Sequence, residues 1–345
     1  MNRGSISFSC IRGTQATMEY YVCMVPLTML SKLFVFSDEE LPASVRSQRI
    51  LNKNRIPEMK NYILQNRDTY VFSALTASVD GDVQFTPIDS SPQHRNIGLI
   101  EIGLDTKILI NDGQHRKAAI EGALKESSDL KYEDIAVVIY PDSGLKRSQQ
   151  MFSDLNRYAV RPTKSLNILY DQRDPFSSMI CTMVDKLPMF GDWVDRERAS
   201  ISNRSKALFT LSGVYGSSER LFRGVPTESQ TADILYDFWL SAYEAMPDWQ
   251  RVVHKEIKAS LLRADFLSGH VVSQKALALV GNRLLLDGKH FSLMHCLKCI
   301  DWSKSNPLWQ GHSVVNDVIS GVDSSVQYIA EYLNKIIDES EDGII

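Results

Sequence analysis

The character of the sequence changes once along the chain, close to residue 143. Up to about residue 141, short β-type runs alternate with helix-type runs; beyond Leu145 the β-type signal nearly vanishes and helical spacing takes over. Alternation of this kind is typical of α/β or α+β domains, and sustained helical spacing is typical of helical ones. We therefore predict an α+β protein, with an α/β domain over residues 1–143 and a mainly helical domain over residues 144–345.

The strands expected in the first half are bounded by turn residues. Asp80-Gly81 favours a two-residue hairpin turn between the runs on either side of it, and a turn near residues 103–106 would join a second pair. The apolar run Tyr20–Leu30, which Pro26 interrupts, is shorter than the ~20 residues that a membrane span needs, so we predict a buried strand there. The expected strands are Tyr20–Leu30, Tyr70–Val79, the run containing Val83 and Phe85, Ile97–Ile102, Lys107–Ile110 and Ile135–Tyr140.

Helices are expected at Ser44–Leu51, Pro57–Gln65 and Gln114–Lys125, and the clearest one lies at the end of the chain. There, Asp323 or Ser324 would cap a helix, and the acidic residues 338–342 would form a frayed tail. One face of this helix is apolar at the spacing of a buried stripe, and its residues are Val326, Ile329, Ala330, Leu333 and Ile337.

The composition narrows the class of protein. With 43% hydrophobic and 23% charged residues, the chain can bury a large core, and nothing indicates disorder. A net charge of -4 argues against coating of nucleic acid by bulk electrostatics, so any DNA contact must be local. Five scattered cysteines fit a reducing cytoplasm better than a disulfide framework. The composition thus indicates a cytoplasmic globular protein with no membrane segment.

The densest group of functional side chains is Asp112-Gly113-Gln114-His115-Arg116, between a buried strand and an amphipathic helix. The first N–H groups of a helix and its dipole attract anions, and Gly113 lets a ligand approach the backbone. Asp112 could hold a metal ion, His115 could move a proton, and Arg116 could grip a phosphate. The alternative is a plain helix start, in which Asp112 accepts backbone N–H bonds and Arg116 pairs with a carboxylate.

These five residues, followed by Lys117-Ala118-Ala119-Ile120, resemble the signature of the DGQHR family. Further stretches resemble the DndB family of DNA phosphorothioation proteins in the same order: Ser47–Asn52 with Arg55-Ile56, Tyr70–Ser78, Phe152–Arg157 and Leu208–Ser212. One departure is Gln172 within Tyr170–Asp174, where the family pattern has His, which puts a catalytic role at that position in doubt. The resemblance implies a first domain similar to ParB-type and sulfiredoxin-type folds, in which the Asp112–Arg116 loop binds nucleotide.

The segment from Leu145 to Arg173 is rich in positive charge, with Phe152, Tyr158 and Tyr170 between the cations. Such a pattern can hold a phosphate backbone and stack on bases, although core aromatics with a solvated basic face would look the same. The candidate DNA-binding residues are Lys146, Arg147, Arg157, Arg161, Lys164 and Arg173. By resemblance to ParB-like folds, Asn156, Arg157 and Lys164 would share a nucleotide with Gly113, Gln114, His115 and Arg116.

Three functions remain in competition. The resemblance implies a DNA-binding accessory protein of a bacterial phosphorothioation system, which regulates the modification genes and limits modification, under nucleotide control. The second is a nucleotide hydrolase or DNA-nicking enzyme, with Asp112 as metal ligand, His115 as proton carrier, and Mg²⁺ and a nucleotide as ligands. The third is a scaffold that docks other phosphorothioation proteins; a homo-oligomer is compatible with all three. Cys296 and Cys299 have metal-like spacing but no second cysteine pair, so we predict an ordinary helix there.

Overall fold

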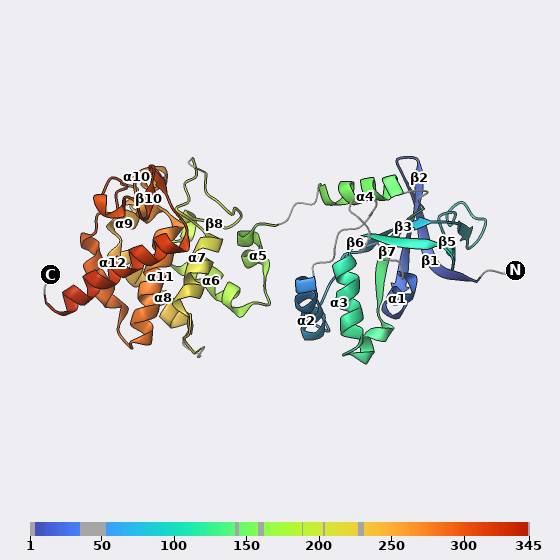
Figure 1. Ribbon diagram of the computed structural model, residues 1–345, viewed down its shortest axis with the longest axis horizontal. Helices are drawn as coiled ribbons and strands as arrows, with labels where there is room; N and C mark the ends of the chain where they lie inside the picture. The colour runs from blue at the N-terminus through green and yellow to red at the C-terminus, as the bar shows by residue number, and fades with distance from the viewer. Residues whose placement is uncertain are drawn as a thin grey trace. The chain divides into compact units, whose positions relative to one another are not determined.

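The protein is described by a computed structural model over residues 4–34, 53–141, 145–157, 162–187, 189–202, 204–226 and 231–343. The chain forms two compact units, Met1–Val160 and Arg161–Ile345 (Figure 1). The helix expected at Ser44–Leu51 lies outside the described residues. The domain boundary expected between residues 143 and 144 stays a prediction.

A seven-stranded mixed sheet dominates the first unit, in the order β4-β5-β1-β2-β7-β3-β6. Only β3 and β7 pair in parallel; the other neighbours are antiparallel. The strands are β1 (Ser5–Gln15), β2 (Met18–Pro26), β3 (Leu75–Asp80), β4 (Val83–Pro87), β5 (Ile97–Gly103), β6 (Lys107–Asp112) and β7 (Asp134–Pro141). The predicted strand from Tyr20 ends at Pro26, after which the chain turns into the 3₁₀ turn η1 (Leu27–Met29) and the short helix α1 (Leu30–Leu33).

Both predicted hairpins are wrong, because their strands do not pair with each other. Instead β3 pairs with β6 and β4 pairs with β5, so residues 75–87 and 97–112 form one long antiparallel ribbon. The ribbon bends at Gly81, whose φ of +149° few other residues adopt. Its two halves join opposite ends of the sheet. The two residues that connect β3 to β4 span at most ~10 Å. In a flat sheet with this strand order the two strands would lie about 24 Å apart, so the sheet is curled.

The concave face of the sheet carries the core of the first unit. On strands such as β2 and β7 buried residues alternate with more exposed ones, and the buried strand residues include Val25, Ala77 and Val137, each with no exposed surface. Two helices cover this face and pack on each other, α2 (Ile56–Gln65) through Ile63 and α3 (Gln114–Leu124) through Ala119, Ile120 and Ala123. The helices predicted at Pro57–Gln65 and Gln114–Lys125 are thus confirmed. The unit also contains the 3₁₀ turns η2 (Lys53–Arg55) and η3 (Ser128–Tyr132), and α4 (Leu145–Arg157).

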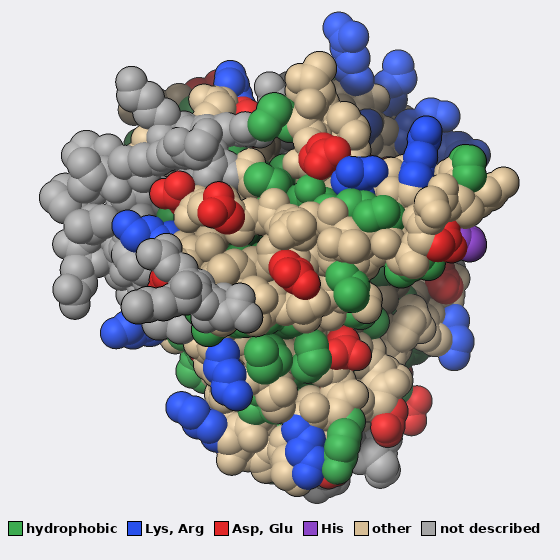
Figure 2. Space-filling view, turned by 90° about the vertical axis from the view of Figure 1, so that its right-hand side faces the viewer, with side chains coloured by type: hydrophobic (Ala, Val, Ile, Leu, Met, Phe, Trp, Pro, Cys, Tyr) green, Lys and Arg blue, Asp and Glu red, His purple; other side chains and the backbone are tan. Residues whose placement is uncertain are grey.

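The other face of the sheet is partly open. Ile11, Met24, Ile97 and Leu99 lie across three neighbouring strands and are each at least 41% exposed. Figure 2 views the molecule from the right-hand side of Figure 1 and shows hydrophobic side chains among charged ones on the surface seen from there. All four side chains therefore keep a large share of their surface in contact with solvent.

The second unit is helical, and its strands have only two residues each, which confirms the predicted change of character. Its core is built on aromatic side chains, with Trp239, Trp249, Trp302 and Trp309 almost fully buried. Its helices are α5 (Lys164–Tyr170), α6 (Pro175–Lys186), α7 (Leu211–Leu221), α8 (Thr231–Ala245), α9 (Pro247–Val253), α10 (Ala259–Asp265), α11 (Val271–Leu286) and α12 (Asp323–Glu341). The remaining elements are η4 (Gly191–Trp193), η5 (Leu267–Gly269), η6 (Phe291–Cys299), η7 (Pro307–Trp309), β8 (Val194–Asp195), β9 (Phe209–Thr210), β10 (Val314–Val315) and β11 (Val318–Ile319).

The last helix shows which local rules held. All five residues of the predicted apolar face of α12 are buried. The predicted cap is wrong: Val322 precedes the helix, and the Asp323 carboxylate accepts a hydrogen bond from Arg220 Nη2 at 2.7 Å instead. The frayed acidic tail is also wrong, because α12 continues to Glu341, where Asp338 pairs with Arg283 and Glu341 with Lys289. Both acidic residues thus form ion pairs with side chains more than 50 residues away in the sequence.

Candidate functional site

The strand, glycine and helix predicted around the Asp112–Arg116 loop are present. β6 ends at Asp112, and Gly113 turns the chain with φ +103° into α3. A Cβ atom at Gly113 would lie 2.4 Å from Leu75 Cδ2, closer than real side chains approach. Glycine is therefore required here twice, by backbone conformation and by the close approach of Leu75.

The start of α3 has the features of an anion site. Gly113 offers no side chain to cap the helix, and the first residues, Gln114 and His115, are half-buried. The Gln114 amide donates weakly back to the Ile110 carbonyl at 3.4 Å. First-turn N–H groups and the helix dipole therefore face the loop, which would stabilise negative charge.

Arg116 is held within the protein by several partners. Its Nη1 atom donates to the carbonyl oxygens of Ser73 at 2.6 Å and Ala74 at 2.8 Å, and to the Ser73 hydroxyl. Its Nη2 atom lies 2.6 Å from Asp112 Oδ2. The Arg116 side chain is 13% exposed, whereas that of Asp112 is 49% exposed. Arg116 thus connects the segment before β3 to the start of α3. Its pairing with the Asp112 carboxylate agrees with the alternative given above, in which the loop is a plain helix start.

The cations of the basic segment are only partly described. The side chains of Lys146, Arg147 and Asn156, and all of Arg161, lie outside the described part of the chain. Arg157, at the end of α4, and Arg173, after α5, are exposed.

Lys164 begins α5 in the second unit. Its amine is exposed, 3.9 Å from Glu219 and 5.3 Å from the ring centre of Tyr215. Tyr170 at the end of α5 is 71% exposed, which contradicts a core role for this aromatic. Gln172, at the position where the family pattern has His, is exposed in the turn before α6.

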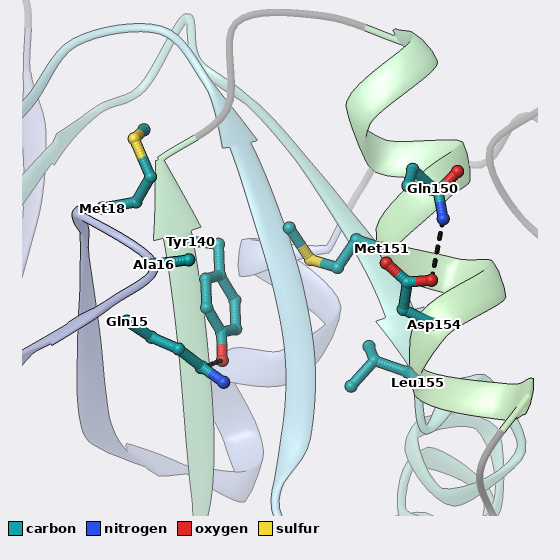
Figure 3. Close-up of a pocket in the computed structure, with 8 residues that line it drawn as sticks. All are labelled: Gln15, Ala16, Met18, Tyr140, Gln150, Met151, Asp154 and Leu155. Carbon is teal, nitrogen blue, oxygen red and sulfur yellow. Dashed lines mark hydrogen bonds between the residues drawn. The ribbon is translucent and has the colours of Figure 1, made fainter.

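Sequence reasoning missed a cavity of about 430 Å³ in the first unit (Figure 3). It lies between the β1–β2 turn, the end of β7 and α4. Met151 and Leu155 point from α4 toward the sheet, and Tyr140 lies opposite, stacked on Tyr20 at 5.5 Å between ring centres. Polar groups at its edge include the Tyr140 hydroxyl, which donates to Gln15 at 3.4 Å. In the sequence, this face of α4 is indicated by Gln150 and Asp154, which are four residues apart and so lie on the same side of a helix. In the structure, their side chains are hydrogen-bonded at 2.7 Å.

The fit of Mg²⁺ at the loop can be judged from its donors. Mg²⁺ prefers oxygen ligands, with one or two carboxylates and substrate phosphates completing its shell. Asp112 offers one half-exposed carboxylate but shares it with the Arg116 guanidinium. In the parts of the chain that the structure describes, no group of three His, Cys, Asp or Glu side chains could hold a metal ion. The loop would need a bound phosphate to complete a Mg²⁺ site.

The structure also bears on the helix predicted at Cys296 and Cys299 and on the absence of a predicted membrane segment. Cys296 and Cys299 lie in the 3₁₀ helix η6, so the ordinary helix predicted there is confirmed as a helix of the tighter type. Among the helices within the described ranges, none is long and apolar enough to cross a membrane.

The comparisons with known proteins agree with the motifs. The model of the DndB family, described as DNA-sulfur modification-associated, matches residues 8–340. No curated protein and no solved structure matches the chain. The likeness to ParB-type and sulfiredoxin-type domains therefore stays a prediction. The match covers both units and nearly the whole chain, and the chain belongs to the DndB family of proteins associated with DNA sulfur modification.

Proposed function

We propose that the chain is a DNA-binding accessory protein of a bacterial DNA phosphorothioation system, which regulates transcription of the modification genes and limits how much DNA is modified. The family match over residues 8–340 carries this proposal. Its proposed partners are DNA and the other phosphorothioation proteins, and its proposed place is the cytoplasm. A homo-oligomer would suit binding to a two-fold symmetric promoter site.

The proposed DNA contact is the basic segment. Arg157 and Arg173 reach solvent, Lys164 forms only a loose ion pair at 3.9 Å, and Tyr170 exposes most of its ring. Exposed cations neutralise phosphates, and an exposed aromatic ring can stack on a base. Lys146, Arg147 and Arg161 complete the proposed set by sequence.

The Asp112–Arg116 loop is the proposed nucleotide site. The N–H groups at the start of α3 would hold a phosphate, with Gln114 and His115 beside it. Arg116 would position the loop through Ser73 and Ala74 rather than serve as the main phosphate ligand, because both of its Nη atoms already donate within the protein. The further proposed nucleotide ligands are Asn156, Arg157 and Lys164.

The DNA proposal is tested by fluorescence anisotropy with a labelled fragment of the modification-gene promoter over a series of salt concentrations. Each phosphate contact contributes about -0.9 to the slope of log Kobs against log salt. Removing Arg157, Lys164 and Arg173 together should therefore make the slope shallower by up to ~2.7 and weaken binding at low salt.

A matched triple variant controls for net charge. Lys298→Ala, Lys335→Ala and Lys255→Ala remove three cations of the second unit outside the basic segment, and the salt slope should then keep its wild-type value. Equal losses in both triple variants would show that only bulk charge matters, and no binding by the wild type at low salt would refute the proposal.

A second proposed function is nucleotide hydrolysis or DNA nicking at the same loop. A half-exposed carboxylate, Asp112, and an imidazole, His115, stand at one helix start, which is the observation that favours it. Asp112→Asn and His115→Ala should each abolish Mg²⁺-dependent turnover while the fold persists. Turnover that is undiminished in both variants would remove the loop from the mechanism. Absence of both DNA binding and turnover in the wild type would favour a scaffold.

A further inference from the structure

The second unit contains a cavity of about 500 Å³, and of its lining residues the proposals above use Lys164 alone. It lies where the first turns of α7 and α11 meet, with the start of α5 at its edge. Binding sites for small organic ligands commonly have volumes of about 300–1,000 Å³. The cavity is therefore large enough for a molecule the size of a nucleotide.

Two helix N-termini line this cavity. α7 has 11 residues and α11 has 16, so both have developed dipoles. They come close because residue 213 is glycine: a Cβ atom there would lie 2.5 Å from Val271 Cγ2. The Thr210 hydroxyl caps α7 by accepting from the Gly213 N–H, whereas the His270 side chain forms no cap at α11. Both ends direct partial positive charge toward one space.

The independent sign of a ligand is Gln274, one turn into α11. Its side chain has no exposed surface, and neither Nε2 nor Oε1 has a hydrogen-bond partner within the described structure. The residue lines the cavity, and its Oε1 atom lies 3.5 Å from the place of a Cβ on Gly213. A buried amide without partners is unfavourable, so its donor and acceptor are poised for a group that enters the cavity.

The charge around the cavity has one sign. Lys164 and Lys275 stand at its edge, and its described lining contains no Asp or Glu. Glu219 is the nearest acid to the Lys164 amine, at 3.9 Å, and both side chains are more than half exposed, so the pair is weak.

One wall of the cavity is fixed by Arg263. It donates to the carbonyl oxygens of Ser202, Ser205 and Ala207, which holds the loop before β9 in place. A fixed wall, two cations and two helix N-termini together form a preorganised anion site.

We propose that this cavity binds a nucleoside phosphate, with the phosphate at the two helix N-termini between Lys164 and Lys275, and the edge of the base at Gln274. An amide pairs with a base edge through one donor and one acceptor, which is the pair that Gln274 has free. The cavity lies in the second unit and the Asp112–Arg116 loop in the first, and the two proposed sites share only Lys164.

The test uses the full chain and isothermal titration calorimetry with the four ribonucleoside 5′-monophosphates, the corresponding nucleosides and inorganic phosphate. At least one monophosphate should bind more tightly than its nucleoside and more tightly than phosphate alone. It should also raise the melting temperature followed by tryptophan fluorescence, since all five tryptophans lie in the second unit and Trp249 contacts Phe209 in the cavity wall.

Gln274→Leu is the decisive variant. It removes the unpartnered amide and keeps a similar volume, so the protein should fold at least as well as wild type, while the monophosphate binds at least about tenfold more weakly. Lys275→Gln, at the cavity edge, should weaken the monophosphate and phosphate about equally. Gln327→Leu, on the exposed face of α12, is the matched control and should bind as wild type.

Three results would overturn the proposal: wild-type affinity in Gln274→Leu, equal affinity for phosphate and every monophosphate, or no binding of any of these ligands. Asp112→Asn separates the two sites. It should leave binding at the cavity unchanged, and loss of all nucleotide binding in Asp112→Asn would assign that binding to the loop and refute the cavity.

Discussion

Replacing Gly113 by alanine tests whether the start of α3 has the strained geometry described above. Gly113 has φ +103°, where a residue with a Cβ atom loses about 1–2 kcal/mol. Its Cβ would also lie 2.4 Å from Leu75 Cδ2, and Leu75 is fully buried and cannot move aside freely. Overpacking of this kind costs about 1–3 kcal/mol. Alanine also restricts the unfolded chain, which offsets about 0.4–1 kcal/mol. The net destabilisation should be roughly 1–5 kcal/mol.

Gly122→Ala provides a control in the same helix. Gly122 is in the body of α3, and a Cβ there would meet only the flexible Lys60 side chain, at 3.3 Å from its Cδ atom. Alanine is favoured over glycine inside a helix by about 0.5–1 kcal/mol. The same chemical change should therefore stabilise the protein at residue 122 and destabilise it at residue 113.

The assay must resolve the two units. Urea unfolding followed by tryptophan fluorescence reports the second unit alone, since it contains all five tryptophans, whereas far-UV circular dichroism reports both. Gly113→Ala should lower the midpoint seen by circular dichroism and leave the fluorescence midpoint unchanged. In a thermal scan, the first unit should melt about 2–20 °C earlier. A first unit with a midpoint at or above the wild-type value would refute both the conformational and the steric argument.

Three further predictions address other contacts. Arg116→Lys should destabilise the first unit by roughly 2–4 kcal/mol, because an ammonium cannot reach the Ser73 and Ala74 carbonyls as a fork, and urea unfolding by circular dichroism measures this loss. Burial and a neighbouring carboxylate raise the pKa of Tyr70 from 10.0 to about 12. The contribution of the Tyr70 hydroxyl to stability is therefore complete below pH 10 and is lost as the pH rises toward 12. The free energy of unfolding should be lower at pH 11 than at pH 8, and equal values would contradict this prediction. Iodoacetamide should modify Cys299 in the native protein before Cys10 and Cys23, because Cys299 is exposed whereas burial raises the pKa of the other two thiols. Peptide mass spectrometry measures the order of modification, and the reverse order would contradict this prediction.

Local patterns predicted the elements better than their partners. The helix at Pro57–Gln65 and the strand at Ile135–Tyr140 followed from residue type and spacing, which depend on the nearest neighbours along the chain. The Asp80-Gly81 pair also marked a real turn, but the strands on either side join different neighbours. The hairpin prediction failed because the turn bends a long ribbon, and strand pairing depends on contacts far apart in sequence.

The candidate site was predicted in the same uneven way. The strand, Gly113 and the helix start were readable from the sequence because their geometry is local. The partners of Arg116 were not, since Ser73 and Ala74 are more than 40 residues away. The Gln274 cavity left no mark in the sequence, because glutamine in a helix is ordinary until the packing of α7 against α11 buries it.

The sequence by itself determined the family, the α+β class and the change from sheet to helices, since these follow from motifs and from residue periodicity. Only the tertiary structure decided which strands pair, which donors of the Asp112–Arg116 loop are already engaged, and where a buried amide lacks a partner. The physical reason is one of range. Backbone preferences act over a few residues, whereas pairing, burial and hydrogen-bond satisfaction depend on whichever distant segments the fold brings together.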